Sequence, residues 1–397
     1  MQNHLHDAEL QTSLAINGTA VYADKSSAYQ ISRDQIESAS LKGRSRFGLG
    51  RGVLRAFYSR IMVLGILGMG LVGHSVQDAI ADEPQVASAT DIKWNSRLEG
   101  FEYPFPVKVY GFESQGQSLE MAYMDVTPNT PNGETIVLLH GKNFSGFYYE
   151  RMANWLVAKG YRVVIIDQIG FGKSTKPAMF QYSLQALATY TRNLLQSLGI
   201  ESHSLLGHSM GGMLATRYSL MYPDLVKKLY LVAPIGLEDW KTMTSYKSVD
   251  ELMQMELAGT REKAKEYQRV AYYGGQWKPE YDQLLVPVTG WLNGPDKELV
   301  AWNAALTSEM LMTQPVYYEF QLLKPETVLI TGERDRTAIG KNWAPPTVQK
   351  EMGDYPALGR KVASLIPNCR FIELKDMGHL PFLENETLFW ELVGEEF

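Results

Sequence analysis

The chain has 397 residues, of which 45% are hydrophobic and 21% charged, a balance typical of a globular protein. Its net charge of −6 excludes the basic surface that a nucleic-acid-binding protein presents. Cys369 is the only cysteine, so no disulfide can form within the chain and stability must come from the core. We therefore expect one large domain with an insert, or two ordinary domains.

The amino-terminal region, residues 1–81, differs from the rest. Five arginines between positions 44 and 60 precede the uncharged run "IMVLGILGMGLVG", and Ala79-Ile80-Ala81 follows it. A basic region, an apolar region of about a dozen residues and a small-residue site predict an export signal cleaved after Ala81. A membrane anchor or a merely buried helix is the alternative, but a spanning helix needs about 20 apolar residues and His74 interrupts the run. We expect an exported protein, periplasmic or secreted, without a stable membrane anchor after cleavage.

From about residue 105, short apolar runs alternate with amphipathic stretches. Two runs separated by the polar turn "ESQGQS" predict a pair of strands at 107–112 and 119–126. Further strands are predicted at 135–141, 161–167, 202–209 and 228–234. Apolar residues every three or four positions predict helices at Tyr149–Lys159, Leu184–Leu198 and Met213–Tyr222. The fold class is therefore α/β, with a mostly parallel sheet covered by helices on both faces.

The alternation stops at Leu237. For almost ninety residues no strand is predicted, and aromatic and charged residues are frequent. Strands resume at 327–335 and 369–374, with helices at 357–366 and 386–393. We expect a sheet domain formed by residues 82–236 and 326–397, interrupted by a mostly helical cap, residues 237–325.

The stretch "IIDQIGFGKST" at residues 165–175 suggests a nucleotide site, because Gly172-Lys173-Ser174 follows a buried strand. A phosphate-binding loop needs a glycine five positions before Gly172, where this chain has Asp167. That carboxylate would repel phosphate, and Lys176-Pro177 delays the helix that should follow. We therefore expect a structural turn and no bound nucleotide.

The stretch "GHSMGG" at residues 207–212 lies where an apolar strand meets an amphipathic helix. Glycines two residues on either side of Ser209 leave room for a sharp turn that exposes its hydroxyl, and the helix N-terminus favours negative charge there. An incidental serine in a glycine-rich turn is the alternative. The strand, turn and helix context favours Ser209 as a nucleophile.

A serine nucleophile needs a base, and four histidines follow residue 81. His203 begins the strand that leads to Ser209, which places it on the wrong side of the sheet. The side chain of His208 should point away into packing, and His140 ends a strand where a histidine more often braces the next loop. Elimination points to His379, in the loop "DMGHLPF" after the last strand.

The histidine in turn needs a carboxylate to fix its tautomer. Asp335 is the best candidate, because it follows a strand whose carboxyl end shares the sheet edge with Ser209 and His379. Glu333 is nearer the strand, but one pleat step turns it elsewhere. Glu238 and Asp239 follow another strand and are the alternatives.

Together these motifs resemble the α/β-hydrolase fold family with an inserted cap, over roughly residues 105–397. The resemblance rests on His140-Gly141, on the Gly-His-Ser-Met-Gly elbow and on the order Ser, Asp, His. It implies an oxyanion hole formed by the backbone N–H groups of Met210 and Lys142, with Asn143 or Phe144 lining the pocket. The stretch "DQIGFGKST" is similar to a structural turn of the family.

The resemblance implies a serine hydrolase that needs no cofactor and no metal and acts on a small-molecule substrate, with no nucleic acid as partner. A serine nucleophile argues against the dehalogenase and epoxide-hydrolase branches, which use a carboxylate. Carboxylic ester hydrolysis is our first expectation. The alternatives are a carbon–carbon bond hydrolase, a non-catalytic binding module, or an aminopeptidase that would need an acidic group such as Glu251, Glu256 or Glu262.

Overall fold

The computed structural model of the protein describes residues 92–397. The predicted export signal and its cleavage site lie outside the described residues. Within the described part, no helix is long and apolar enough to cross a membrane.

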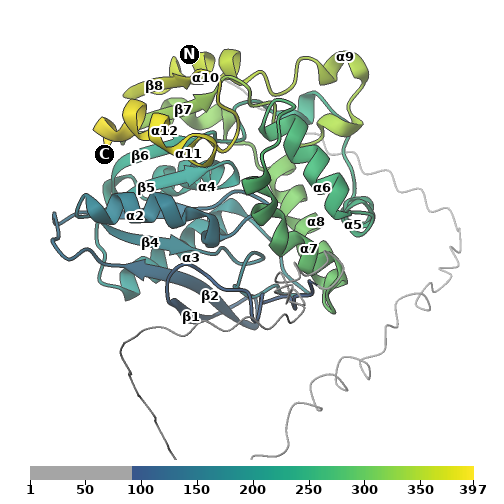
Figure 1. Ribbon diagram of the computed structural model, residues 1–397, viewed down its shortest axis with the longest axis horizontal. Coiled ribbons are helices and arrows are strands. Elements are labelled where there is room, and N and C mark those ends of the chain that lie inside the picture. Colours follow the sequence, from purple (N-terminus) through teal and green to yellow (C-terminus); the bar gives the residue numbers. More distant parts are fainter. Residues whose placement is uncertain (1–91) are drawn as a thin grey trace, which may run out of the picture. The chain divides into compact units, whose positions relative to one another are not determined.

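An eight-stranded sheet forms the centre of the described part (Figure 1). Its strands are β1 (Val107–Ser114), β2 (Gln117–Val126), β3 (Thr135–Leu139), β4 (Arg162–Ile166), β5 (His203–His208), β6 (Val226–Val232), β7 (Glu326–Gly332) and β8 (Cys369–Leu374). They lie in the order β1-β2-β4-β3-β5-β6-β7-β8, and only β2 pairs antiparallel with its two neighbours. The predicted mostly parallel sheet is confirmed, and the parallel strands end at one shared edge.

The first two strands form a tighter hairpin than the sequence suggested. Gln115 and Gly116 alone connect β1 to β2, and their φ angles are +51° and +70°. Two central residues with positive φ give the turn whose twist matches that of paired strands. The predicted six-residue turn is therefore wrong, because its outer residues belong to the strands.

Helices cover both faces of the sheet (Figure 1). One face carries α3 (Leu184–Ser197), α4 (Met210–Met221) and α10 (Tyr355–Ala363), and the other carries α2 (Glu150–Ala158), α11 (Pro381–Glu384) and α12 (Glu386–Val393). Successive residues of a strand pack into the apolar clusters on opposite faces of the sheet, as Val137 and Leu138 of β3 do. Such two-sided burial explains the continuous apolar runs of these strands. The short helix α9 spans Pro346–Gln349.

The segment between β6 and β7 contains four α-helices and no strand (Figure 1). They are α5 (Val249–Leu257), α6 (Arg261–Tyr267), α7 (Val286–Leu292) and α8 (Lys297–Thr313). Ser248 and Glu251 form a reciprocal capping box that begins α5. Part of the segment packs with the sheet, because Tyr272, Tyr273 and Tyr281 belong to an apolar cluster of the core. The boundaries of a separate cap, residues 237–325, stay a prediction.

Residues 92–103, which we call the N-terminal strap, connect the segment between β6 and β7 to the core. Trp94 N donates to Gly290 O at 2.9 Å, and Ser96 N donates to Asp296 Oδ2 at 2.7 Å. A β-carbon on Gly290 would overlap the ring of Trp94, so the glycine permits this close packing. On the core side, Lys173 Nζ donates to Leu98 O at 2.8 Å.

Candidate active site

Ser209 lies in a strained turn between β5 and α4. Its φ of +56° and ψ of −118° place a non-glycine residue in a region that favours glycine. A β-carbon on Gly207 would overlap the backbone of Gly211, and one on Gly211 would overlap the carbonyl oxygen of Leu139. The glycines on either side of the serine are therefore required by close backbone approach, as the sequence pattern predicts. Helix α4 begins at Met210, three residues before its predicted start, because the turn leads directly into it.

Asp335 and His379 meet at the edge where the parallel strands end. Asp335 follows β7, His379 follows β8, and His379 Nδ1 lies 2.6 Å from Asp335 Oδ2. Both side chains are fully buried, and Thr337 N donates to the other carboxylate oxygen at 2.9 Å. Asp335 thus fixes the tautomer of His379 with its proton on Nδ1. His379 Nε2, the second ring nitrogen, is buried and has no hydrogen-bond partner, so the hydroxyl of Ser209 does not bond to it in this conformation.

The alternative acids make other contacts. Glu333 accepts a hydrogen bond from Asp376 N at 3.0 Å. Glu238 accepts from Gly353 N at 2.9 Å, and Asp239 accepts from Tyr318 Oη at 2.9 Å. The three carboxylates that the sequence offered as alternatives are therefore bonded to groups other than His379. Of the four candidate acids, Asp335 is the one in contact with His379.

The other three histidines of the described part are buried and differ in their partners. His140 accepts from Gln168 N at 3.1 Å and contacts Gly141 O at 2.9 Å, so it braces the following loop as expected. Burial lowers the pKa of His203 to about 4, and neither of its ring nitrogens has a partner. His208 packs in the interior, as expected, but it also forms two hydrogen bonds that the sequence did not suggest, to Tyr148 and to the backbone of His379.

The predicted oxyanion donors belong to two segments next to Ser209. Met210 is the first residue of α4, and the first N–H groups of a helix have no acceptor within that helix. A β-carbon on Gly141 would lie 3.0 Å from the β-carbon of Ser209, so the loop that carries Lys142 passes next to the serine. The ammonium of Lys142 lies 3.3 Å from Glu256 Oε1 on α5.

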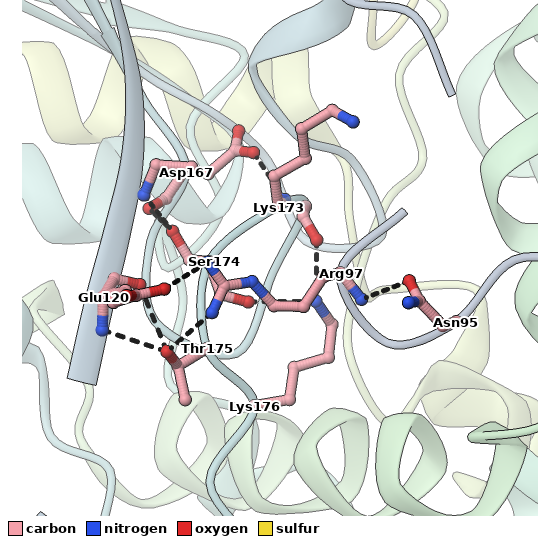
Figure 2. A network of polar contacts seen from close by, with 10 residues as sticks. Asn95, Arg97, Glu120, Asp167, Lys173, Ser174, Thr175 and Lys176 are labelled. Atoms are coloured by element: carbon pink, nitrogen blue, oxygen red, sulfur yellow. Dashed lines mark hydrogen bonds and ion pairs between the residues drawn. The ribbon is translucent and has the colours of Figure 1, made fainter. Parts of the chain in front are cut away.

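The glycine-rich turn after β4 surrounds a carboxylate of its own chain (Figure 2). Asp167 accepts from Gly146 N at 2.6 Å, from Tyr103 Oη at 2.7 Å and from Lys173 N at 2.8 Å. A β-carbon on Gly172 would overlap this carboxylate, and the φ of Gly172 is +48°. Within the turn, Lys173 N is thus bonded to Asp167, and Gly170 N and Ser174 N are bonded to carbonyl oxygens of the turn itself. These bonds occupy donors that a phosphate would need, which supports a structural turn.

The two lysines of this turn also have partners within the chain. Lys173 Nζ reaches the N-terminal strap and lies 5.0 Å from the ring centroid of Tyr103. Lys176 Nζ donates to Gly172 O at 2.7 Å and lies 5.0 Å from the ring centroid of Trp291. Burial lowers the pKa of the Lys176 ammonium to about 7. Neither lysine is free to bind phosphate.

A cleft lies between the helices that follow β6 and the loops that follow the strands. Asn143 and Glu256 line three of its adjoining cavities, of which the central one has a volume of about 390 Å³. One end is mostly apolar and is lined by Phe171, Val288, Trp291, Leu292, Val300 and Ala301. Asn143 therefore lines the cleft, whereas Phe144 is buried beside Tyr148. Ser209 is only 4% exposed, so it is covered in this conformation.

Sequence reasoning missed the residues that fasten the loops of Asp335 and His379 to each other. Arg334 Nη2 lies 2.7 Å from Glu384 Oε2, and Gly378 N donates to Glu384 Oε1 at 2.8 Å. Burial raises the pKa of Glu384 to about 7. The carbonyl of Tyr272, in the π-helical turn Gln268–Tyr272, accepts from His379 N at 2.8 Å. No motif marks these residues, although π-helical turns are frequent at functional sites.

Comparisons with known proteins agree with this architecture. Residues 134–274 match the family model described as alpha/beta hydrolase fold. The solved structure of a probable hydrolytic enzyme from Pseudomonas aeruginosa is 46% identical, with a TM-score of 0.76, and the match covers 77% of this chain and 98% of that chain. A lipase from Moraxella sp. is 27% identical over 64% of this chain and 73% of its own length. A probable 1-acylglycerol-3-phosphate O-acyltransferase from Oryza sativa is 30% identical over 72% of each chain.

Proposed function

The chain belongs to the α/β-hydrolase fold family and is a hydrolytic enzyme, and from this premise we propose that it cleaves small carboxylic esters through Ser209, His379 and Asp335. One observation carries the proposal: the buried pair of Asp335 and His379 lies at the sheet edge where Ser209 follows β5 in a strained turn. A base oriented by a carboxylate beside a strained serine is the arrangement that acyl transfer requires.

In the proposed reaction, His379 Nε2 takes the proton of the Ser209 hydroxyl as its oxygen attacks the ester carbonyl. The backbone N–H groups of Met210 and Lys142 stabilise the negative oxygen of the tetrahedral intermediate. His379 then gives its proton to the leaving alcohol, and an acyl group remains on Ser209. Water enters through the same base and releases the carboxylic acid. Asp335 keeps the Nδ1 proton in place and stabilises the charged imidazole throughout.

Charge pairing in the cleft favours an ester over an amino-terminal peptide bond. An aminopeptidase needs an unpaired carboxylate to bind the substrate ammonium, and three glutamates were candidates. Glu256 lines the cleft but pairs with Lys142 at 3.3 Å. Glu251 is bonded to Ser248 in the capping box of α5. Glu262 lines a neighbouring cavity that shares Tyr267 with the cleft but contains neither Asn143 nor Glu256. The bonded state of Glu256 and Glu251 therefore favours an ester over a substrate with an amino-terminal ammonium, and the mostly apolar end of the cleft favours an apolar acyl or alcohol group.

Covalent labelling tests the proposal without knowledge of the natural substrate. Intact-mass analysis of the full chain after reaction with a fluorophosphonate should show one adduct, which disappears in Ser209→Ala and in His379→Ala. Hydrolysis of p-nitrophenyl acetate should follow the same pattern. An adduct that persists in Ser209→Ala, or no adduct on folded wild-type protein, would overturn the proposal.

A further inference from the structure

Two buried side chains outside the proposed triad connect its histidine to the oxyanion loop. His208 Nε2 lies 2.8 Å from the carbonyl oxygen of His379, and His208 Nδ1 lies 2.9 Å from Tyr148 Oη. Tyr148 Oη in turn accepts a hydrogen bond from Gly141 N at 3.0 Å. A continuous chain of three hydrogen bonds therefore joins the backbone of His379 to the backbone of Gly141, the residue before Lys142.

The chemistry of the groups fixes the direction of each bond in this chain. A carbonyl oxygen only accepts, so His208 Nε2 carries the proton that bonds to His379 O. A neutral imidazole then has an acceptor at Nδ1, to which the hydroxyl of Tyr148 must donate. The same hydroxyl oxygen accepts from Gly141 N–H, which can only donate. For a neutral imidazole each atom thus has one role, because the other tautomer would place the lone pair of Nε2 against the carbonyl oxygen of His379.

The surroundings keep His208 in this neutral form. The side chain is fully buried and packs against the rings of Phe144, Tyr148, His379 and Phe382. Burial lowers its pKa well below the ordinary value, and the nearby His379 and His140 lower it further. A protonated His208 would donate from Nδ1, so the hydroxyl of Tyr148 would accept from both His208 and Gly141 and its own proton would lose this acceptor.

We propose that His208 and Tyr148 are positioning residues that hold the backbone of His379 and the oxyanion loop in register with Ser209. The inference rests on the proposed function, because it assigns these residues to the same acyl transfer. Both side chains are buried and line none of the cavities of the cleft. They act by fixing two loops that approach Ser209 from different strands, and sub-ångström placement of such groups changes reaction rates strongly.

Two variants of His208 separate its two hydrogen bonds. In His208→Gln the side-chain amide nitrogen extends to the position of Nε2 and can donate to His379 O, whereas in His208→Asn the shorter side chain reaches only the position of Nδ1. We expect His208→Asn to lower the rate of fluorophosphonate labelling and the kcat for p-nitrophenyl acetate about tenfold, the effect of one lost hydrogen bond in the transition state. His208→Gln should retain the rate within about threefold, and KM should stay unchanged in both.

A double-mutant cycle tests whether the residues act as one unit. Tyr148→Phe should also lower kcat about tenfold, because it removes the hydroxyl that keeps the proton of His208 on Nε2, a proton that the amide of His208→Gln carries without help. The double variant with His208→Asn should lose no more than about tenfold in total, because the shortened side chain no longer reaches His379 and Tyr148 has nothing left to orient. Independent structural roles would instead multiply to a loss of about 100-fold.

Matched controls separate positioning from stability. His203→Asn changes the same residue type at the other end of β5, and Tyr218→Phe removes a buried hydroxyl that has no partner. Both should leave the labelling rate of the folded protein unchanged, whatever they do to Tm. Equal loss in His208→Asn and His208→Gln, or an additive cycle, would overturn the positioning role while labelling of the wild type sustains the proposed function. An unlabelled wild type would overturn the proposed function, and this inference with it.

Discussion

Two glycine-rich turns follow the strands on either side of β3, and they differ in what occupies the space next to their backbone. After β4, Gly172 makes room for the carboxylate of Asp167, which accepts three hydrogen bonds. After β5, the glycines allow Ser209 to turn sharply, and the carboxylate at this edge of the sheet, Asp335, pairs with His379 instead of with the turn. Glycine spacing thus indicates close backbone approach, while the neighbouring side chain decides whether the turn is structural or reactive.

The largest expected effect is a loss of activity that depends on the turn after β5. Asp335→Asn should lower kcat by about 10³- to 10⁴-fold, because an amide can donate to Nδ1 and so favour the wrong tautomer of His379. The variant should still fold, and kinetics with p-nitrophenyl acetate measure the loss. Asp239→Asn is the matched control, since Asp239 was an alternative acid and should leave kcat within about threefold. The reverse result would assign the acid to Asp239.

The next prediction concerns stability at the other end of β5, and the pH dependence of unfolding measures it. His203, at the opposite end of the strand from Ser209, has a folded pKa of about 4, below the ordinary 6.5. Folding favours the neutral form of His203. Its contribution to the free energy of unfolding is therefore fully present above pH 6.5 and is lost as the pH falls toward 4.

Between pH 7 and pH 4 the free energy of unfolding should fall by about 3 kcal/mol, because each unit of difference between the folded and the ordinary pKa is worth about 1.4 kcal/mol. His203→Phe should therefore reduce the acid dependence of the free energy of unfolding by about this amount, measured in urea between pH 7 and pH 4. A parallel pH dependence in both proteins would show that His203 contributes nothing.

On the structural side, Asp167→Asn should cost about 2 kcal/mol of stability, because an amide cannot accept all three hydrogen bonds and one donor stays unpaired. The change in urea midpoint measures this cost, and the labelling rate of the folded variant should stay near that of the wild type. Asp167→Gly completes the phosphate-loop pattern. It should also be destabilised and should show no ATP binding by calorimetry, and measurable ATP binding would reopen the nucleotide interpretation.

The smallest expected effect concerns strain in the reactive turn. Ser209→Gly should raise the free energy of unfolding by about 1 kcal/mol while abolishing activity, because glycine adopts the φ of +56° without steric cost. Ser209→Ala keeps the β-carbon and should show no such gain. Equal stability of the two variants would mean that the turn stores no strain.

The sequence predicted those features that leave a periodic or local pattern. The buried strands show continuous apolar runs, and Gly207 and Gly211 mark the turn around Ser209. The pairing of His379 with Asp335 followed from sheet topology, because strand ends meet at one edge. The expected role of His140 in bracing the next loop followed from its position at a strand end.

Contacts between segments that are distant in the chain leave no such pattern in the sequence. The hydrogen bond between Tyr272 and His379 joins a π-helical turn to a loop, and the ion pair of Arg334 with the buried Glu384 forms only through tertiary packing. His208 was assigned to packing from its position beside the nucleophile, which gives no information on what its ring nitrogens contact. Such partners depend on the approach of loops that single-sequence periodicity does not describe.

The N-terminal strap has a consequence for the order in which the molecule is completed. Ser96 bonds to Asp296, and Trp291 to Asn95, across sequence separations of 200 and 196 residues. During synthesis the strap leaves the ribosome early, but its docking partners appear only after six of the eight strands. Closing so long a loop is entropically expensive until the sheet has brought its ends together. The apolar end of the cleft, where Trp291 lies, is therefore assembled late, after the strand and turn that carry Ser209.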